Sequence, residues 1–310
     1  MTRLLLAALG ALLVLTGCTS AARETSAPQP AVAVMGGDAG ILPTTVRGTD
    51  GAEVIVSDTS RIVALNGGIT ETLFALGLGD SLVGRDVSSD LPEAEPIEVV
   101  TQGHDVSPEG VLALNPSLVL ADARTGPPEA LAAIRNAGVP VVLVPEVWSL
   151  EEMPKRVRAI ADAVGRSDAA DAIIAASTSS PTRVRGEPVV AFLYLRGNAA
   201  VYLLGGDGSG ADSLLEAVGA VDAGSRAGLG AFTPLTPEAL AEAQPDALLV
   251  MEKGLESVGG VDGLLALPGV AQTPAAKNRR VIVVPDGLLL NFGPRTPQTL
   301  RAIAGQLDGE

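Results

Sequence analysis

Two stretches of the chain, SPEGVLALNPSLVLA (residues 107–121) and TPEALAEAQPDALLV (residues 236–250), repeat one pattern and decide the fold. Each starts with a Ser or Thr, then Pro and Glu. These residues suit the start of a helix, because the hydroxyl caps it, Pro fits the first turn and the carboxylate faces the positive end of the helix dipole. In both copies a second proline ends the helix before an apolar strand. The pattern therefore predicts one helix–strand unit that occurs twice.

Apolar strand patterns alternate with helical patterns along most of the chain after Arg61. Continuous apolar strands between helices are typical of parallel sheets that are covered on both faces. The expected fold class is therefore α/β, with two similar Rossmann-like lobes built on central, mostly parallel sheets. Strands are expected at 62–65, 117–121, 139–144, 189–195, 247–251 and 281–284, and helices at 69–77, 107–114, 127–137, 150–164, 210–218, 236–243 and 261–267.

The repeat also divides the chain into domains. A first lobe is expected over residues 45–166, opening with a hairpin whose turn is Thr49-Asp50-Gly51. A single connecting helix is expected within 167–186, and a second lobe over 187–310. Because clefts at domain interfaces are common ligand sites, a bound molecule is expected in the cleft between the lobes.

The N-terminus, MTRLLLAALGALLVLTGC, has the features of an export signal. Its apolar run, Leu4–Leu15, is shorter than the roughly 20 residues that span a membrane, so residues 1–17 are expected to be a signal peptide. The end of this run resembles a bacterial lipobox, which implies that Cys18 carries a lipid anchor; an ordinary secretory signal is the alternative. Residues 18–44 are expected to form a flexible tether that holds the protein on the extracytoplasmic face of the cell membrane.

Composition excludes several functional classes. The chain has 310 residues, is 47% hydrophobic and carries a net charge of −15, which disfavours duplex nucleic acid as a partner. One cysteine and one histidine exclude thiolate-based and histidine-rich metal sites. The sequence has no P-loop, GxSxG or HExxH motif, so a binding protein is predicted rather than an enzyme.

The lipobox, the tether, the duplicated lobes and two helical glutamates together resemble the helical-linker class of ABC-transporter substrate-binding proteins. Members of this class bind vitamin B12, ferric siderophores or haem. The resemblance implies that Glu71, in ITETLFALG, and Glu216, in DSLLEAVG, dock onto arginines of a permease that works with an ATPase. From the residues alone, both carboxylates could equally be solvated side chains on helix surfaces.

Three further segments are similar to members of this class from actinobacterial haem uptake. They are TQGHDVSPEGVLALNPSLVL (101–120), FLYLRGNAAVYLLGGDGSGADSLLEAVG (192–219) and GLESVGGVDGLLALPGVAQTPAAKNRRV (254–281). The similarity implies that His104 and Tyr194 bind the iron of haem b from opposite faces, with Arg196 hydrogen-bonded to the tyrosine. The cargo would be ferric haem, delivered for iron acquisition.

The chemistry of these residues fits that role. Haem iron accepts histidine nitrogen or tyrosine oxygen as an axial ligand. A phenol ionises near pH 10, so ferric iron and an adjacent guanidinium would both help a tyrosine to bind as phenolate. In a strand, residues 194 and 196 point to the same face. Tyr202 remains a competing phenol.

Two alternatives to haem transport stay open: a corrinoid or ferric-siderophore binder of the same class, and a haem sensor or surface protein without transport.

Other residues are weaker candidates for contact with the ligand. Ligand contacts are considered at Gly67–Ile69, Trp148 and Met251, and partners for haem propionates at Arg85, Arg124 and Arg295.

Overall fold

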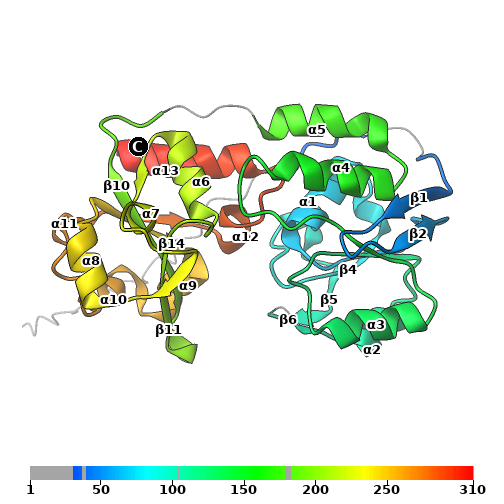
Figure 1. Cartoon of the computed structure of the whole chain (residues 1–310), viewed down its shortest axis with the longest axis horizontal. Coiled ribbons are helices and arrows are strands. Elements are labelled where there is room, and N and C mark those ends of the chain that lie inside the picture. Colours follow the sequence, from blue (N-terminus) through cyan, green and yellow to red (C-terminus); the bar gives the residue numbers. More distant parts are fainter. Residues whose placement is uncertain (1–30, 37–39, 104, 179–182, 310) are drawn as a thin grey trace, which may run out of the picture. The chain divides into compact units, whose positions relative to one another are not determined.

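Residues 31–36, 40–103, 105–178 and 183–309 are described by the computed structural model (Figure 1). The expected signal peptide, Cys18 and His104 lie outside these described residues. Among the helices that are described, none is both long enough and apolar enough for a membrane span.

The first lobe is built on a parallel five-stranded sheet with strand order β5-β4-β3-β8-β9. The antiparallel hairpin β1–β2 precedes it, as expected from the turn at residues 49–51. The elements of this lobe are β1 (Thr44–Arg47), β2 (Glu53–Val56), β3 (Ile62–Ala64), α1 (Gly67–Ala75), β4 (Leu82–Arg85), β5 (Glu98–Val99), β6 (Thr101–Gln102), β7 (Asp105–Val106), α2 (Pro108–Ala113), β8 (Leu118–Ala121), α3 (Pro128–Asn136) and β9 (Val141–Leu143), with short 3-10 helices at Gly79–Ser81 and Pro92–Ala94.

The second lobe is built on a mixed sheet with the main order β13-β11-β10-β14-β15. Strands β10, β12, β14 and β15 run parallel, while β11 is antiparallel to both of its neighbours. The elements are β10 (Val189–Arg196), β11 (Val201–Gly205), α6 (Ala211–Val218), β12 (Val221–Asp222), α7 (Ala223–Arg226), β13 (Phe232–Pro234), α8 (Pro237–Ala243), β14 (Ala247–Met251), α9 (Glu252–Ser257), α10 (Gly260–Ala266), α11 (Pro274–Lys277), β15 (Val281–Val284), α12 (Asp286–Leu289) and α13 (Thr296–Asp308), with a 3-10 helix at Gly197–Ala199.

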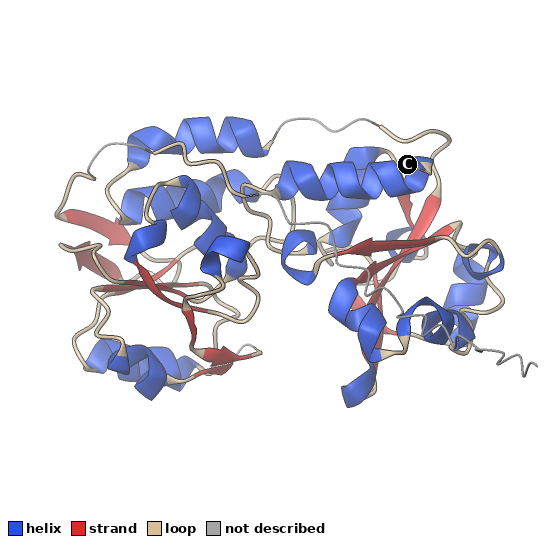
Figure 2. Cartoon of the chain, turned by 180° about the vertical axis from the view of Figure 1, so that it is seen from behind, coloured by secondary structure: helices blue, strands red, loops and turns tan. Residues whose placement is uncertain are grey.

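The two copies of the sequence repeat fold alike. Ser107 Oγ accepts a hydrogen bond from the backbone N–H of Gly110 at 3.0 Å, and Thr236 Oγ1 accepts one from that of Ala239 at 3.1 Å. The capped helix α2 leads into β8, and α8 leads into β14. Each of these strands is fourth in the order of its sheet. The protein is thus a two-lobed α/β protein, and Figure 2 shows helices beside the strands of both lobes.

The chain passes from the first sheet to the second through two helices that pack against each other, α4 (Met153–Ala163) and α5 (Ala170–Ser177). A 3-10 helix at Ser167–Ala169 joins them. Helix α5 occupies part of the expected connector 167–186. The division of the chain into segments 45–166, 167–186 and 187–310 stays a prediction.

The described part of the expected tether is attached to the first lobe. The N–H of Met35 donates to the carbonyl of Ala75 at 2.7 Å, and the N–H of Ile41 donates to that of Gly165 at 2.9 Å. Met35 also packs against the hydrophobic core. Residues 35–36 and 41 of the segment 18–44 are therefore not a free tether, because they have backbone partners in the folded lobe.

One hydrophobic cluster runs through both lobes. It includes Ile62 and Leu73 of the first lobe together with Phe192 and Leu249 of the second, all fully buried. Separate clusters cover the opposite face of each sheet. Because the lobes share apolar packing, their contact is part of the folded core.

Candidate functional site

The carboxyl ends of strands from both sheets border one cavity of about 610 Å³. In open parallel sheets this edge is the usual place for a ligand, and the volume lies within the range of small-molecule sites. Most of the lining residues lie within a few positions of the end of a strand: Leu65, Asn66, Asp86, Val87, Ser88, Thr101, Gly103, Asp122, Arg124, Thr125, Trp148, Tyr194, Arg196, Leu203, Phe232, Met251, Lys253, Asp286, Leu290 and Asn291.

Tyr194 and Arg196 lie on the same face of β10 and both line the cavity. The guanidinium carbon of Arg196 is 4.6 Å from the centre of the Tyr194 ring, and its Nη2 pairs with Asp286 Oδ1 at 3.3 Å. The family resemblance implied a hydrogen bond from Arg196 to the phenol oxygen of Tyr194. Within the described residues, Arg196 instead stacks on the face of the ring, because Asp286 holds its charged end.

Tyr202 is excluded as a lining residue by the register of the sheet. Tyr194 is opposite Leu203 and Leu195 is opposite Tyr202, so successive pairs alternate between the two faces. Leu203 lines the cavity, whereas Tyr202 packs against the apolar cluster on the far face. Of the two tyrosines in the chain, Tyr194 is therefore the one whose side chain borders the cavity.

An aromatic wall joins residues of both lobes. The ring of Phe232 makes edge contacts with Trp148 at 6.0 Å and with Tyr194 at 5.7 Å between centroids. Arg124 lies over Trp148, 4.5 Å from the centre of its ring, and pairs with Glu146 at 3.4 Å. The cavity thus has two arginine–aromatic stacks, one in each lobe.

Among the described residues, the cavity is also lined by a cationic side chain that the sequence patterns did not single out, Lys253. Lys253 lines it two residues after Met251, which ends β14, also lines the cavity and had been considered as a contact. The useful signal was its position, two residues beyond a strand that the sequence predicts correctly.

Two of the acidic side chains that line the cavity, Asp86 and Asp122, come from the first lobe. Asp86 is buried and accepts hydrogen bonds from the hydroxyls of Ser88 and Ser89. Burial raises the pKa of Asp86; these hydrogen bonds oppose the rise, and the charge of Asp122 adds to it. Asp122 accepts a hydrogen bond from Asn66 Nδ2 at 2.9 Å.

The structure does not describe His104 itself, but Gly103, the residue before it, lines the cavity. Whether His104 faces Tyr194 stays a prediction. Cys18 is likewise outside the described residues.

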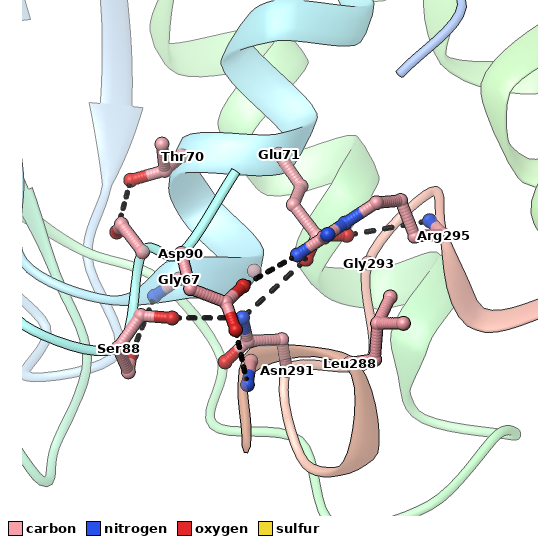
Figure 3. Close-up of polar contacts among 12 residues, drawn as sticks. Gly67, Thr70, Glu71, Ser88, Asp90, Leu288, Asn291, Gly293 and Arg295 are labelled. Atoms are coloured by element: carbon pink, nitrogen blue, oxygen red, sulfur yellow. Dashed lines mark hydrogen bonds and ion pairs between the residues drawn. The ribbon is translucent and has the colours of Figure 1, made fainter. Parts of the chain in front are cut away.

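Glu71 is not a surface residue, which corrects its expected docking role. It is 1% exposed, and its carboxylate pairs with Arg295 at 2.8 Å and accepts a hydrogen bond from Asn291 at 3.4 Å (Figure 3). Burial raises the pKa of Glu71, and the guanidinium of Arg295 opposes that rise. Helix α1 is buried on every side except at Phe74, so a carboxylate on it has no route to solvent.

Arg295, considered above as a propionate partner, is also buried and already paired. It binds Glu71 and, at 2.9 Å, Asp90. Burial lowers the pKa of Arg295, but the two carboxylates outweigh this and raise it overall, so the guanidinium stays charged. Arg85 is occupied as well, because it donates to the carbonyl oxygens of Ile97 and Ser89. Neither arginine lines the cavity.

The glycine pair at the start of α1 makes room for the protein itself and not for a flat ligand. A Cβ on Gly67 would collide with the side chain of Asn291, and one on Gly68 with Arg156. Arg156 is fully buried and donates to the carbonyl of Phe292 at 2.8 Å. Burial lowers the pKa of Arg156 to about 10.

Comparison with known proteins places the chain in a family. Residues 62–288 match the model of a family described as periplasmic binding protein. Because the match covers most of the chain, the protein belongs to the periplasmic binding protein family, whose members are extracytoplasmic binding proteins.

Individual proteins of known structure or sequence are similar to this chain to different extents. The chain shares 35% sequence identity and a TM-score of 0.85 with the heme binding protein HmuT, covering 92% of this chain and 96% of HmuT. Structures have also been solved for variants of HmuT in which a histidine, a tyrosine or an arginine is replaced by alanine. The tyrosine and the arginine are two positions apart in the HmuT sequence. YvrC of Bacillus subtilis, an ABC transporter substrate-binding lipoprotein, is 26% identical over 276 residues, 85% of each chain. The vitamin B12-binding protein of Pectobacterium carotovorum is 31% identical over 102 residues, 33% of this chain and 37% of that protein.

Proposed function

We propose that this protein is the substrate-binding component of an ABC transporter and that it binds haem in the cavity between its lobes. The observation that carries the proposal is the arrangement of Tyr194 and Arg196. One phenol and one guanidinium, stacked at 4.6 Å, face a cavity with an aromatic wall. The likeness to HmuT over almost the whole chain supports haem as the cargo.

Tyr194 is the proposed axial ligand, and its oxygen would bind ferric iron as phenolate. Arg196 supports it by stacking on the tyrosine ring, and Asp286 fixes the position of the guanidinium. The spacing of the tyrosine and arginine varied in HmuT equals that of Tyr194 and Arg196, which supports this assignment. His104 is the proposed second ligand, on the opposite face.

The attachment to the membrane is proposed from the N-terminal sequence. Cys18 would carry the lipid, after removal of residues 1–17 as a signal peptide. The naming of YvrC as a lipoprotein supports this. Replacing Cys18 by Ser would release the protein from membranes into the medium, as a fractionation experiment would show.

The docking residues must be exposed acids, which Glu71 is not. Glu216 is exposed on α6. A better matched pair is Glu109 and Glu238, the carboxylates of the sequence repeat. Both are exposed in the first turns of α2 and α8, one in each lobe. We therefore propose Glu109 and Glu238 as the contacts with the permease, which would work with its ATPase.

The test is an absorption titration of the purified protein with hemin. A saturable Soret band is expected for the wild type and for Tyr202→Phe, a matched control on the far face of the sheet. Tyr194→Ala and His104→Ala should weaken or change the band. Absence of saturable binding in the wild type would overturn the proposal.

A corrinoid is the second candidate, favoured by the partial likeness to the vitamin B12-binding protein. Titration with cyanocobalamin in place of hemin decides between the two. Saturable binding of cobalamin, without saturable binding of hemin, would show that the cargo is a corrinoid and not haem.

A further inference from the structure

Three cationic side chains line the cavity in the part of the chain that the structure describes: Arg124, Arg196 and Lys253. The two arginines are already compensated. Arg124 pairs with Glu146 at 3.4 Å and with Asp122 at 3.6 Å, and Arg196 pairs with Asp286 at 3.3 Å. An incoming anion could bind either arginine only in competition with these carboxylates.

Lys253 differs from both arginines. Its backbone N–H donates to Asp286 Oδ2 at 2.9 Å, which fixes the main chain at the start of α9. Its side-chain ammonium makes no ion pair within the described residues, and the residue is exposed. The main chain is thus held in place, while the charged end can move to meet a ligand.

The chain uses lysine sparingly. It has three, Lys155, Lys253 and Lys277, among 21 basic residues. Lys155 and Lys277 are exposed on α4 and α11, and neither lines the cavity. Lys253 is therefore the one lysine at the site, and the other two serve as internal controls.

We propose that Lys253 binds a carboxylate of the ligand, which for haem is a propionate; this rests on the proposed function. A lysine ammonium and a carboxylate form a charge-assisted hydrogen bond without geometric demands on the anion. The cavity would thereby select a ligand by two features: a metal that Tyr194 can bind and a carboxylate that Lys253 can bind.

The test compares hemin with hemin dimethyl ester, whose propionates are uncharged. Lys253→Gln should weaken hemin binding about tenfold, as expected for the loss of one charge-assisted hydrogen bond, and leave ester binding unchanged. Lys277→Gln, the matched control, should bind both like the wild type. Lys253→Arg should restore most of the affinity for hemin.

Chemical labelling gives an independent readout. An amine-reactive reagent followed by mass spectrometry should show hemin protecting Lys253 while Lys155 and Lys277 react as before. Equal labelling of Lys253 with and without hemin would contradict the proposal.

The outcomes separate the two proposals. A wild type that does not bind hemin overturns the proposed function. A wild type that binds hemin, with Lys253→Gln unchanged, overturns only the role of Lys253. Equal losses for hemin and its ester would also overturn that role, because they would show a contact that ignores the carboxylate.

Discussion

The carboxylate of Glu71 and the guanidinium of Arg295 meet at 2.8 Å, although 224 residues separate them in the chain. Glu71 lies on α1 beside the first sheet, and Arg295 precedes α13 beside the second. Asp90 binds the same guanidinium, and Asn291 joins the carboxylate of Glu71 (Figure 3). The pair therefore fastens the segment that precedes α13 to the first lobe.

Removing one partner of this buried pair should be strongly destabilising. Arg295→Met leaves Glu71 buried without its cation and should lower the free energy of unfolding by about 3–5 kcal/mol. Glu71→Leu combined with Arg295→Met should lose less than the sum of the two single changes, because no isolated charge remains at Glu71. Urea denaturation of the four proteins measures this coupling, and simple additivity would argue against it.

The buried carboxyl of Asp86 should make stability depend on pH. Because burial raises its pKa in the folded state, the stabilising contribution of its protonated form is fully present below the ordinary value of 3.8 and is lost as pH rises through the raised value. Asp86→Asn should therefore gain stability relative to the wild type as pH rises from acidic to neutral. Thermal unfolding across that range tests this, and a constant difference would contradict it.

Arg196 should affect hemin binding through Tyr194, the axial ligand that it supports. Arg196→Ala should weaken hemin binding by about 10–100-fold, the usual cost of losing a residue that orients a metal ligand, and Tyr194→Ala should weaken it more. Arg196→Ala combined with Tyr194→Ala should be close to Tyr194→Ala alone. Hemin titrations of the three variants compare their affinities. If the losses from the two single changes simply add in the double variant, Arg196 contacts the haem independently of Tyr194.

Trp148 should report on occupancy of the cavity. It is the only tryptophan in the chain and it lines the cavity. Hemin bound there should quench most of the tryptophan fluorescence in proportion to saturation, because energy transfer to a nearby porphyrin is efficient. Fluorescence and Soret titrations should give the same midpoint, whereas unquenched Trp148 at saturation would place the ligand elsewhere.

Docking onto the permease should depend on the carboxylates of the repeat. Glu109→Ala with Glu238→Ala should weaken the functional affinity for the permease about tenfold or more, through lost complementary charge. Glu216→Ala serves as the comparison variant, because Glu216 is the exposed glutamate that the family resemblance implied as a docking residue. Stimulation of ATPase activity in proteoliposomes measures the effect, and unchanged hemin binding shows that the cavity is intact. A loss confined to Glu216→Ala would reverse the assignment.

Much of the fold was predictable because its signals are local. The strands at 247–251 and 281–284 agree with β14 and β15, and the repeat predicts α2 and α8 together with their caps. The short strands β4 and β5 were missed. So was the long helix α13, although Thr296 and Pro297 at its start resemble the start of the repeat helices; the structure has Arg295 at the N-cap, without a side-chain hydrogen bond to the helix.

The errors at the site have a different origin. The sequence predicts correctly that Tyr194 and Arg196 share a face, since strand alternation is local. It could not show that Asp286 would take the guanidinium, because that contact spans 90 residues. The burial of Glu71 had a signal in the composition of α1, GGITETLFA, which lacks a polar face. The exposed acids Glu109 and Glu238 were present in the repeat that decides the fold.

The separation of Glu71 and Arg295 by 224 positions in the sequence bears on how the protein is made. A ribosome synthesises Glu71 and its whole lobe long before it reaches the counter-ion. Until then the first lobe lacks the guanidinium that pairs with Glu71, and the apolar cluster shared with the second lobe is also incomplete. The packing around Glu71 is thus completed only after Arg295 has been synthesised, 224 positions later. Deleting the last turns of the protein, including Arg295, would in the same way unsettle the lobe at its opposite end.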